Sequence, residues 1–139
     1  MSVTLRLTGL EELKAALLKL PAEFHAEGFG YVKTATDGSA ADLRAAYSAV
    51  QKSGKLARGV TTEYPSTTVA VGRVRSRAKH SHLYEYGTQV RRTAQGWNRG
   101  AGPAHPTAIP IFRRRRDTLR GQLIAMVRRA GLTVTGDVG

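Results

Sequence analysis

The hydrophobic period of this chain changes twice, and these changes restrict its fold more than any other feature. Residues 21–50 and 109–131 place apolar side chains every three or four positions, which is the period of an amphipathic α-helix. Three runs between them, RGVTTEY, TTVAVGRV and SHLYEYGT, fit the period of two of half-buried strands. We therefore predict an α+β fold, in which an antiparallel meander sheet is packed by an N-terminal helical segment and a C-terminal amphipathic helix.

The first fifty residues are predicted to carry one strand before the helices begin. Residues 3–7 alternate Val and Leu with polar side chains, as a half-buried strand does. Thr8 and Glu11 have the spacing of a capping box that opens a helix, and Pro21 suits the first turn of the next helix. The TDGS sequence at residues 36–39 indicates a turn followed by a second capped helix, with one long kinked helix as the alternative.

The predicted sheet begins after the KSGKL segment and has its first tight turn at Pro65 and Ser66. With 139 residues, the chain is expected to form a single domain. Its predicted parts are a strand plus helical half at residues 1–52, the β-meander at 53–88, a long basic loop at 89–108, the C-terminal helix at 109–131 and a tail at 132–139.

The segment at residues 87–108, GTQVRRTAQGWNRGAGPAHPTA, has no hydrophobic period and is rich in Gly and Arg. A loop of this length without secondary structure is uncommon in a compact domain and usually has a function. Trp97, the only tryptophan, lies in its middle. Two interpretations stay open: the indole packs back onto the domain's own core, or it is an interface residue that a partner orders.

The last helix is predicted to begin near Pro110 and to end at Gly131, which suits a C-cap; residues 132–136 then predict a short edge strand. The four consecutive arginines near its start do not form a basic tail, because a helix distributes them around its circumference. At about 100° per residue, one apolar stripe contains Phe112, Leu119, Leu123, Met126, Val127 and Ala130. Arg113, Arg114, Arg120 and Arg128 point away from the stripe, and Arg115 and Arg116 flank it.

The positive charge of the chain is concentrated in its C-terminal half. Residues 1–72 carry 8 Lys and Arg against 7 Asp and Glu, and residues 73–139 carry 14 against 3. Such asymmetry is typical of a surface that meets a polyanion, whether nucleic acid, an acidic protein or a membrane face. A solvated basic surface without a partner would give the same counts.

Several classes of protein are disfavoured by what the sequence lacks. It has no run of 18 apolar residues that would span a membrane, and its N-terminus does not resemble a signal peptide. It has no cysteine, so disulfides and thiolate metal sites are excluded. These absences lead us to expect a soluble intracellular domain without a membrane partner.

No pattern of catalytic residues is present either. The GFG sequence at residues 28–30 lacks the third glycine of a dinucleotide fingerprint, and there is no phosphate-binding Walker loop. His80, His82 and Glu85 do not have the spacing of a structural zinc site. We therefore expect no enzyme activity, no catalytic residues, no cofactor and no metal site.

Three short motifs follow one another in a fixed order along the chain. Gly54 and Leu56 lie in SGKL, the YEYGT motif occupies residues 84–88, and HPTAIP occupies residues 105–110. In this order and spacing they resemble the neck and tail-completion protein family of long-tailed double-stranded DNA bacteriophages. The resemblance extends over about residues 5–130. The residues that carry it, and that it places in the family motif and subunit interface, are Gly54, Leu56, Tyr84, Glu85, Tyr86, Gly87, Thr88, Pro106 and Pro110.

The resemblance implies a structural virion protein without catalytic activity. It implies a homo-oligomeric ring, usually sixfold, around the DNA channel at the head–tail junction of the virion. During assembly the protein would be in the host cytoplasm. Its neighbours would be head-completion, tail terminator or tail tube proteins, with non-specific contact to packaged duplex DNA. In this context Gly87 is expected to take a positive φ, Thr88 to hydrogen-bond the turn, and Glu85 to pair with an arginine of its own or a neighbouring chain.

The side chains expected to contact a partner or the DNA channel come from the long loop and the last helix. A contact with a neighbouring subunit is slightly favoured for those on the helix. A small basic nucleic-acid-binding protein and a tail terminator ring are the alternative functions, and a toxin-like nuclease lacks the acidic and histidine residues it would need. The predicted contact residues are Arg91, Arg92, Trp97, Arg99, Arg113, Arg114 and Arg120.

Overall fold

The structure, a computed structural model, describes residues 21–50 and 53–132. The predicted strand at residues 3–7, the helix that follows it and nearly all of the edge strand at residues 132–136 lie outside these ranges. The elements are α2 (Ala22–Val50), α3 (Lys55–Arg58), β1 (Val60–Glu63), β2 (Arg73–Ser76), α4 (Ser81–Tyr86) and α5 (Ala108–Arg129).

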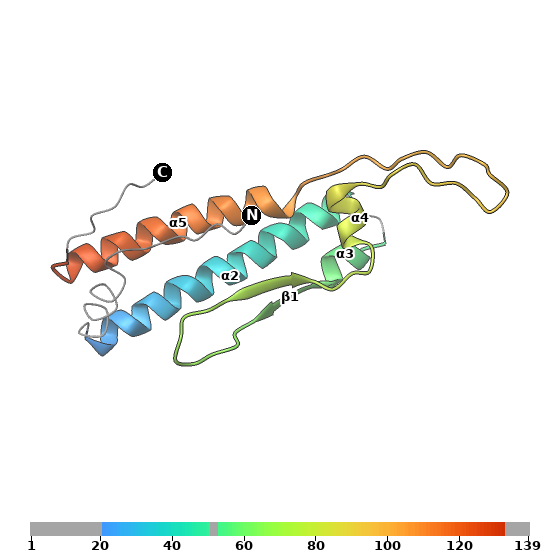
Figure 1. Cartoon of the computed structure of the whole chain (residues 1–139). Coiled ribbons are helices and arrows are strands. Elements are labelled where there is room, and N and C mark those ends of the chain that lie inside the picture. The colour runs from blue at the N-terminus through green and yellow to red at the C-terminus, as the bar shows by residue number, and fades with distance from the viewer. Residues whose placement is uncertain (1–20, 51–52, 133–139) are drawn as a thin grey trace, which may run out of the picture.

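The α+β fold class is confirmed. Helices α2 and α5 run side by side in opposite directions, and the sheet lies along α2 (Figure 1). Between α4 and α5 the chain leaves this body as a long arm (Figure 1). The predicted order of an N-terminal helical segment, an antiparallel sheet, a long loop and a C-terminal helix is therefore correct.

Helix α2 runs without interruption through residues 36–39, so the predicted turn is wrong and one long helix is correct. The hydroxyl groups do not cap a new helix there. Thr36 Oγ1 donates to the Val32 carbonyl oxygen and Ser39 Oγ donates to the Ala35 carbonyl oxygen, each at 2.7 Å. Both residues are buried. Tertiary burial of these small side chains therefore overrides their local preference for a turn.

The sheet has two strands in the part of the chain that the structure describes. Strands β1 and β2 pair antiparallel, from Val60 opposite Ser76 to Glu63 opposite Arg73. Residues 64–72 connect them as a loop that is longer than the predicted tight turn. In that loop Ser66 Oγ accepts hydrogen bonds from the backbone N–H groups of residues 68 and 69. We call β1, β2 and this loop the hairpin.

The third predicted strand is wrong, because residues 81–86 form helix α4. Tyr84 packs against the core and the adjacent Glu85 is buried. A strand would point these two neighbouring side chains to opposite faces, whereas a helical turn directs both toward the body.

The core lies where α2 meets α3, β1, α4 and the first turns of α5. Its most buried members come from one face of α2, and α5 adds partly buried side chains to it. The predicted apolar stripe of α5 is confirmed, since none of its members is exposed. The buried core residues are Ala40, Leu43, Tyr47, Leu56 and Val60, with Phe112 of α5 packed against them.

The predicted C-cap of α5 is also confirmed. Gly131 has φ 79°, a conformation that favours glycine. Its N–H donates to the Arg128 carbonyl oxygen at 3.0 Å, and the N–H of Leu132 donates to the Val127 carbonyl oxygen at 3.2 Å. This pair of bonds is the Schellman motif, which satisfies the last carbonyl groups of the helix.

The contact between the hairpin and α2 at Gly72 gives a first prediction. A Cβ at Gly72 would lie 1.9 Å from Thr36 Oγ1 and within 3 Å of the other side-chain atoms of Thr36. Gly72→Ala is therefore expected to lower the free energy of unfolding by about 1–3 kcal/mol, because the strand must move away from the helix. Urea unfolding followed by circular dichroism measures the change.

Gly30→Ala is the matched control. Gly30 lies within α2, and a Cβ there would meet nothing within 4 Å. The substitution should raise the free energy of unfolding by about 0.5–1 kcal/mol through the helix preference of alanine. Equal effects of the two substitutions would contradict the close approach at Gly72.

Candidate functional site

The arm, residues 87–107, is the feature that departs most from a compact domain (Figure 1). Its two sides are joined by backbone hydrogen bonds, so the arm is a narrow pair of extended segments and not an irregular loop. Near its base the N–H of Thr88 donates to the Gly102 carbonyl oxygen, and farther out the N–H of Arg99 donates to the Arg91 carbonyl oxygen at 2.8 Å. The tip is a turn in which the Thr93 N–H donates to the Trp97 carbonyl oxygen at 2.9 Å.

Gly87 fixes the point where the arm leaves the body. Its φ is 73°, as predicted, although it follows a helix and not a strand. A Cβ there would lie 2.7 Å from the Gly102 carbonyl oxygen, so the two sides of the arm approach too closely for any other residue. Thr88 hydrogen-bonds as expected, but across the arm: its Oγ1 accepts from the Gly102 N–H at 2.7 Å.

Tyr84 and His105 join the two motifs that border the arm. The N–H of His105 donates to the Tyr84 carbonyl oxygen at 3.0 Å. The two rings are stacked with their centroids 5.2 Å apart. On its other side, the Tyr84 ring meets Tyr47 of α2 edge to face at 5.6 Å. The aromatic contacts therefore connect α2, α4 and the returning side of the arm.

Glu85 has a role that the sequence did not predict. Its carboxylate accepts hydrogen bonds from the backbone N–H of Thr107 at 2.8 Å and of Ala108 at 3.1 Å, which are the first groups of α5. The hydroxyl of Thr107, the N-cap residue, does not cap this helix end and donates instead to the His105 carbonyl oxygen. A carboxylate at a helix N-terminus satisfies unpaired N–H groups and is favoured by the helix dipole.

Glu85 makes no ion pair with an arginine among residues 21–50 and 53–132, so the predicted pair within its own chain is not found there, and a pair with a neighbouring chain stays a prediction. The remaining partner of its carboxylate is the hydroxyl of Tyr47, which donates to Oε1 at 2.7 Å. Tyr47 is almost fully buried, and this burial, together with the Glu85 carboxylate, raises the pKa of its phenol. The phenol therefore keeps its proton and remains a hydrogen-bond donor to Glu85.

Some of the other predicted motif residues form the turn before β1, and the rest are exposed. Gly54 has φ 64° and precedes α3, in which Leu56 is buried, so the SGKL segment forms a turn before β1. Tyr86, by contrast, is 74% exposed. Pro106 and Pro110 are also exposed.

The arm carries an exposed apolar and basic surface. Trp97 is 71% exposed at its tip, so the interpretation that it packs onto the core is wrong. Val90, on the outgoing side, is 58% exposed. The predicted contact residues Arg91, Arg92 and Arg99 are all exposed along the same arm.

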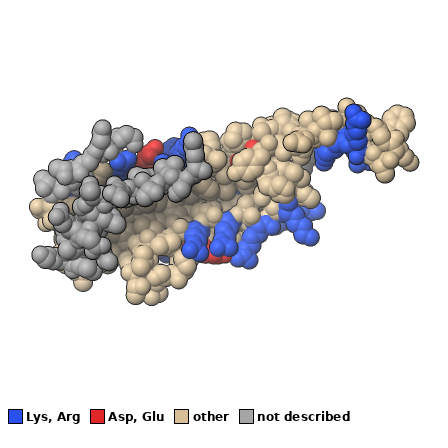
Figure 2. Space-filling model, in the orientation of Figure 1, with Lys and Arg blue, Asp and Glu red and all other residues tan. Residues whose placement is uncertain are grey.

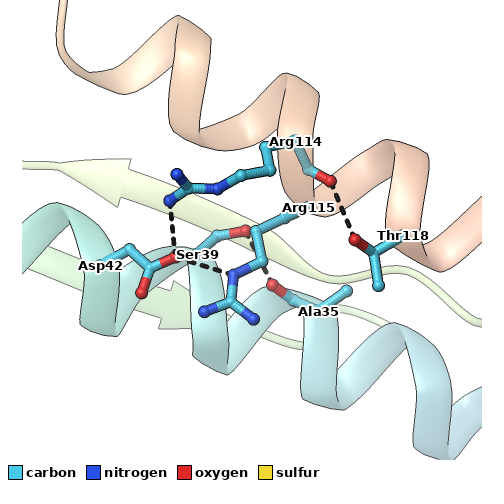
Figure 3. Close-up of polar contacts among 6 residues, drawn as sticks. All are labelled: Ala35, Ser39, Asp42, Arg114, Arg115 and Thr118. Carbon is cyan, nitrogen blue, oxygen red and sulfur yellow. Dashed lines mark hydrogen bonds and ion pairs between the residues drawn. The ribbon is translucent and has the colours of Figure 1, made fainter.

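The arginines at the start of α5 differ from one another in their contacts. Arg115 Nε donates to Asp42 Oδ2 of α2 at 2.8 Å, and Arg114 reaches the same oxygen at 3.5 Å (Figure 3). Hydrogen bonding by Arg115 lowers the pKa of Asp42. Arg113 and Arg120 are exposed and make no ion pair with any residue that the structure describes. Arg115 therefore links α5 to α2, and Arg114, whose side chain is 71% exposed, adds a longer contact to the same carboxylate.

A basic surface on the hairpin was missed as a site, although its signal is present in the sequence. Arg73, Arg75, Arg77 and Lys79 occur at every second position, and all four are exposed. Residues in a strand that alternate in this way share one face. Figure 2 shows a row of basic side chains along the lower edge of the body.

The described residues contain no group of three or more His, Cys, Asp or Glu side chains that could hold a metal ion. An open groove of about 260 Å³ lies between α2, the hairpin and α5, lined by Phe112, Leu119 and Arg115 among others. No carboxylate lines it. No helix in the described ranges is long and apolar enough to cross a membrane.

Comparisons of the chain with models of protein families, with curated proteins and with solved structures find no match.

Glu85 gives the second prediction. Glu85→Ala leaves the Tyr47 hydroxyl and two helix N–H groups without an acceptor, so it is expected to lower the free energy of unfolding by about 3 kcal/mol. Glu85→Gln keeps one carbonyl oxygen and should lower it by about 1–2 kcal/mol. A double-mutant cycle in urea with Tyr47→Phe should show coupling between the two residues. Additive effects would contradict the hydrogen bond between them.

Asp42 gives a prediction that depends on pH. Its pKa is lower in the folded chain than in the unfolded chain, so its contribution is present above the unfolded pKa of about 3.9 and is lost as the pH falls through the folded value. Asp42→Asn should lower the free energy of unfolding by about 0.5–1 kcal/mol at pH 7, and the difference from the unsubstituted chain should shrink below about pH 4.

Asp117→Asn is the control for Asp42. It removes an exposed carboxylate of α5 that makes no ion pair with a described residue. Urea titrations at pH 7 and at acidic pH should give a smaller change for this variant. A constant difference for Asp42→Asn at every pH would show that its ion pair does not stabilise the fold.

Proposed function

We propose that this protein is a structural subunit of the head–tail junction of a long-tailed double-stranded DNA bacteriophage. It forms a neck or tail-completion ring around the DNA channel and joins head to tail, without catalytic activity. The observation that carries the proposal is the arm, a braced extension that leaves the body (Figure 1). Its tip carries the exposed Trp97.

The bracing of the arm supports an assembly role. The two motifs of the phage resemblance, residues 84–88 and 105–110, lie against each other at the base of the arm through Tyr84 and His105. Glu85 connects the same motifs through the first N–H groups of α5. A base held by this many bonds restricts the direction of the arm, which lowers the entropy lost when its tip binds a partner.

The composition of the arm supports a protein neighbour. An exposed Trp97 at the tip and Val90 on one side give it apolar contact area, and tryptophan is enriched among residues that dominate interface energies. An arm of one subunit that reaches the body of the next gives a head-to-tail contact. Such contacts close into a ring when the rotation between neighbouring subunits is a whole fraction of a full turn. We propose a ring of six copies.

Trp97→Ala tests this proposal. The substitution should abolish ring formation or incorporation into particles while leaving the circular dichroism spectrum and thermal stability of the monomer unchanged, because the indole is exposed. Size-exclusion chromatography with light scattering measures the ring. Because Trp97 is the only tryptophan, its fluorescence should shift to shorter wavelength when the ring or particle forms.

Gln95→Ala, an exposed position in the same turn, is the matched control and should assemble normally. Electron micrographs of phage particles that lack the protein give an independent result. Full heads beside finished but unattached tails are expected, whereas overlong tails would identify a tail terminator instead. Normal assembly by Trp97→Ala would reject the arm as the contact.

A further inference from the structure

The outer face of β2 is basic along its whole length. Arg73 and Arg75 are exposed, and the residues between them and after them, Val74 and Ser76, are half-buried. The alternation continues past the strand, with Arg77 and Lys79 exposed and Ala78 half-buried. We call Arg73, Arg75, Arg77 and Lys79 the basic stripe. Within β2, where the spacing is regular, it places one positive charge about every 6.6–6.8 Å.

The basic stripe is held in place from behind. Val74 and Ala78 pack against the hydrophobic core. The Arg77 N–H donates to the Gly59 carbonyl oxygen at 2.7 Å, which extends the pairing with the first strand beyond Ser76. The charges therefore stand on a strand backed by the core.

One carboxylate, Glu63, interrupts the positive charge on this face. It lies opposite Arg73 in the sheet, and its oxygens pair with Arg77 at 2.7 Å and with Arg75 at 3.2 Å. The hydrogen bond from Arg77 and the charges of the neighbouring arginines lower the pKa of Glu63. One carboxylate against four basic side chains leaves an excess of three positive charges. Lys55 and Arg58 of α3 are exposed as well.

Some other basic side chains also have partners within the chain, as Arg75 and Arg77 of the stripe do. Arg115 and Arg114 pair with Asp42, and Arg129 pairs with Glu27. The arm carries three arginines, but its tip is apolar. Helix α5 also carries exposed arginines, and the stripe differs from them in that its charges lie on an extended segment with regular spacing. Figure 2 shows basic side chains along the lower edge of the body.

We propose that the basic stripe is a binding surface for the phosphate backbone of duplex DNA, used without sequence readout. Regularly spaced arginines and lysines on a supported strand fit the repeating charge of a nucleic acid backbone. Arginine and lysine on this face can contact phosphates, and the half-buried side chains between them cannot reach base edges. The choice of DNA among polyanions rests on the proposed function, and the surface itself rests on the geometry of the hairpin.

The salt dependence of binding tests the surface. Four phosphate contacts predict that the affinity for a 20-base-pair duplex falls about 150-fold between 50 and 200 mM salt. Arg73→Gln combined with Lys79→Gln leaves two contacts and should reduce this fall to about 12-fold. Fluorescence anisotropy with two labelled duplexes of unrelated sequence measures the affinities, which should be equal for the two sequences.

Two further variants test whether binding depends on the basic stripe and not on positive charge elsewhere, and whether a loss of binding comes from misfolding. Arg116→Gln combined with Arg128→Gln removes the same charge from exposed positions of α5 and should leave the salt dependence near that of the unsubstituted chain. Glu63→Gln removes the one carboxylate of the hairpin face and should tighten binding severalfold, a gain that a folding defect would not produce. Equal losses for the hairpin and α5 pairs, or no gain for Glu63→Gln, would overturn the proposal.

The outcomes also separate this proposal from the ring. If the ring forms but the DNA affinity is unchanged by Arg73→Gln and Lys79→Gln, the DNA-binding role of the stripe is rejected and the ring is not. Salt-dependent binding through the stripe by a chain that never forms a ring or joins a particle would reject the ring alone. Binding to an acidic polypeptide but not to DNA would assign the stripe to a protein neighbour.

Discussion

The rest of the structure depends on the hydrogen bonds that the buried carboxylate of Glu85 accepts. It accepts a hydrogen bond from Tyr47 of α2 and caps the first N–H groups of α5, while it belongs to α4 itself. Three segments distant in the sequence therefore meet at one side chain. A buried carboxylate is stable only when hydrogen bonds replace the water it has lost, and here each bond also fixes the position of a helix.

This junction separates two parts of the molecule that have different roles. On one side lies a body in which α2 and α5 are held together by the core and by the ion pair between Asp42 and Arg115. On the other side lies the arm, which is joined to the body at its base and held together beyond it by its own backbone hydrogen bonds. The exposed Trp97 is therefore carried on a support of fixed direction, which is the arrangement that a contact with a neighbouring subunit needs.

The charge of the C-terminal half is divided among structural and exposed arginines. Arg115 and Arg114 stabilise the contact between the two long helices, although the sequence presents them as part of one polybasic run. Arg73 and Arg75 of the basic stripe stand on β2, which is supported by the core, and Arg75 and Arg77 share the carboxylate of Glu63. A count of charges thus indicated a polyanionic partner, but the surface that could meet it depends on which arginines already have acidic neighbours.

The sequence by itself determined the α+β class, the apolar stripe of α5, the Gly131 cap and the positive φ of Gly87, because each follows from a local period or a local backbone preference. Only the tertiary structure decided that residues 36–39 stay helical, that residues 81–86 form a helix and that Glu85 caps α5. Those outcomes depend on neighbours distant in the chain. Close approach to the hairpin favours small buried residues in α2, and the N-terminus of α5 supplies donors that no local pattern around Glu85 reveals.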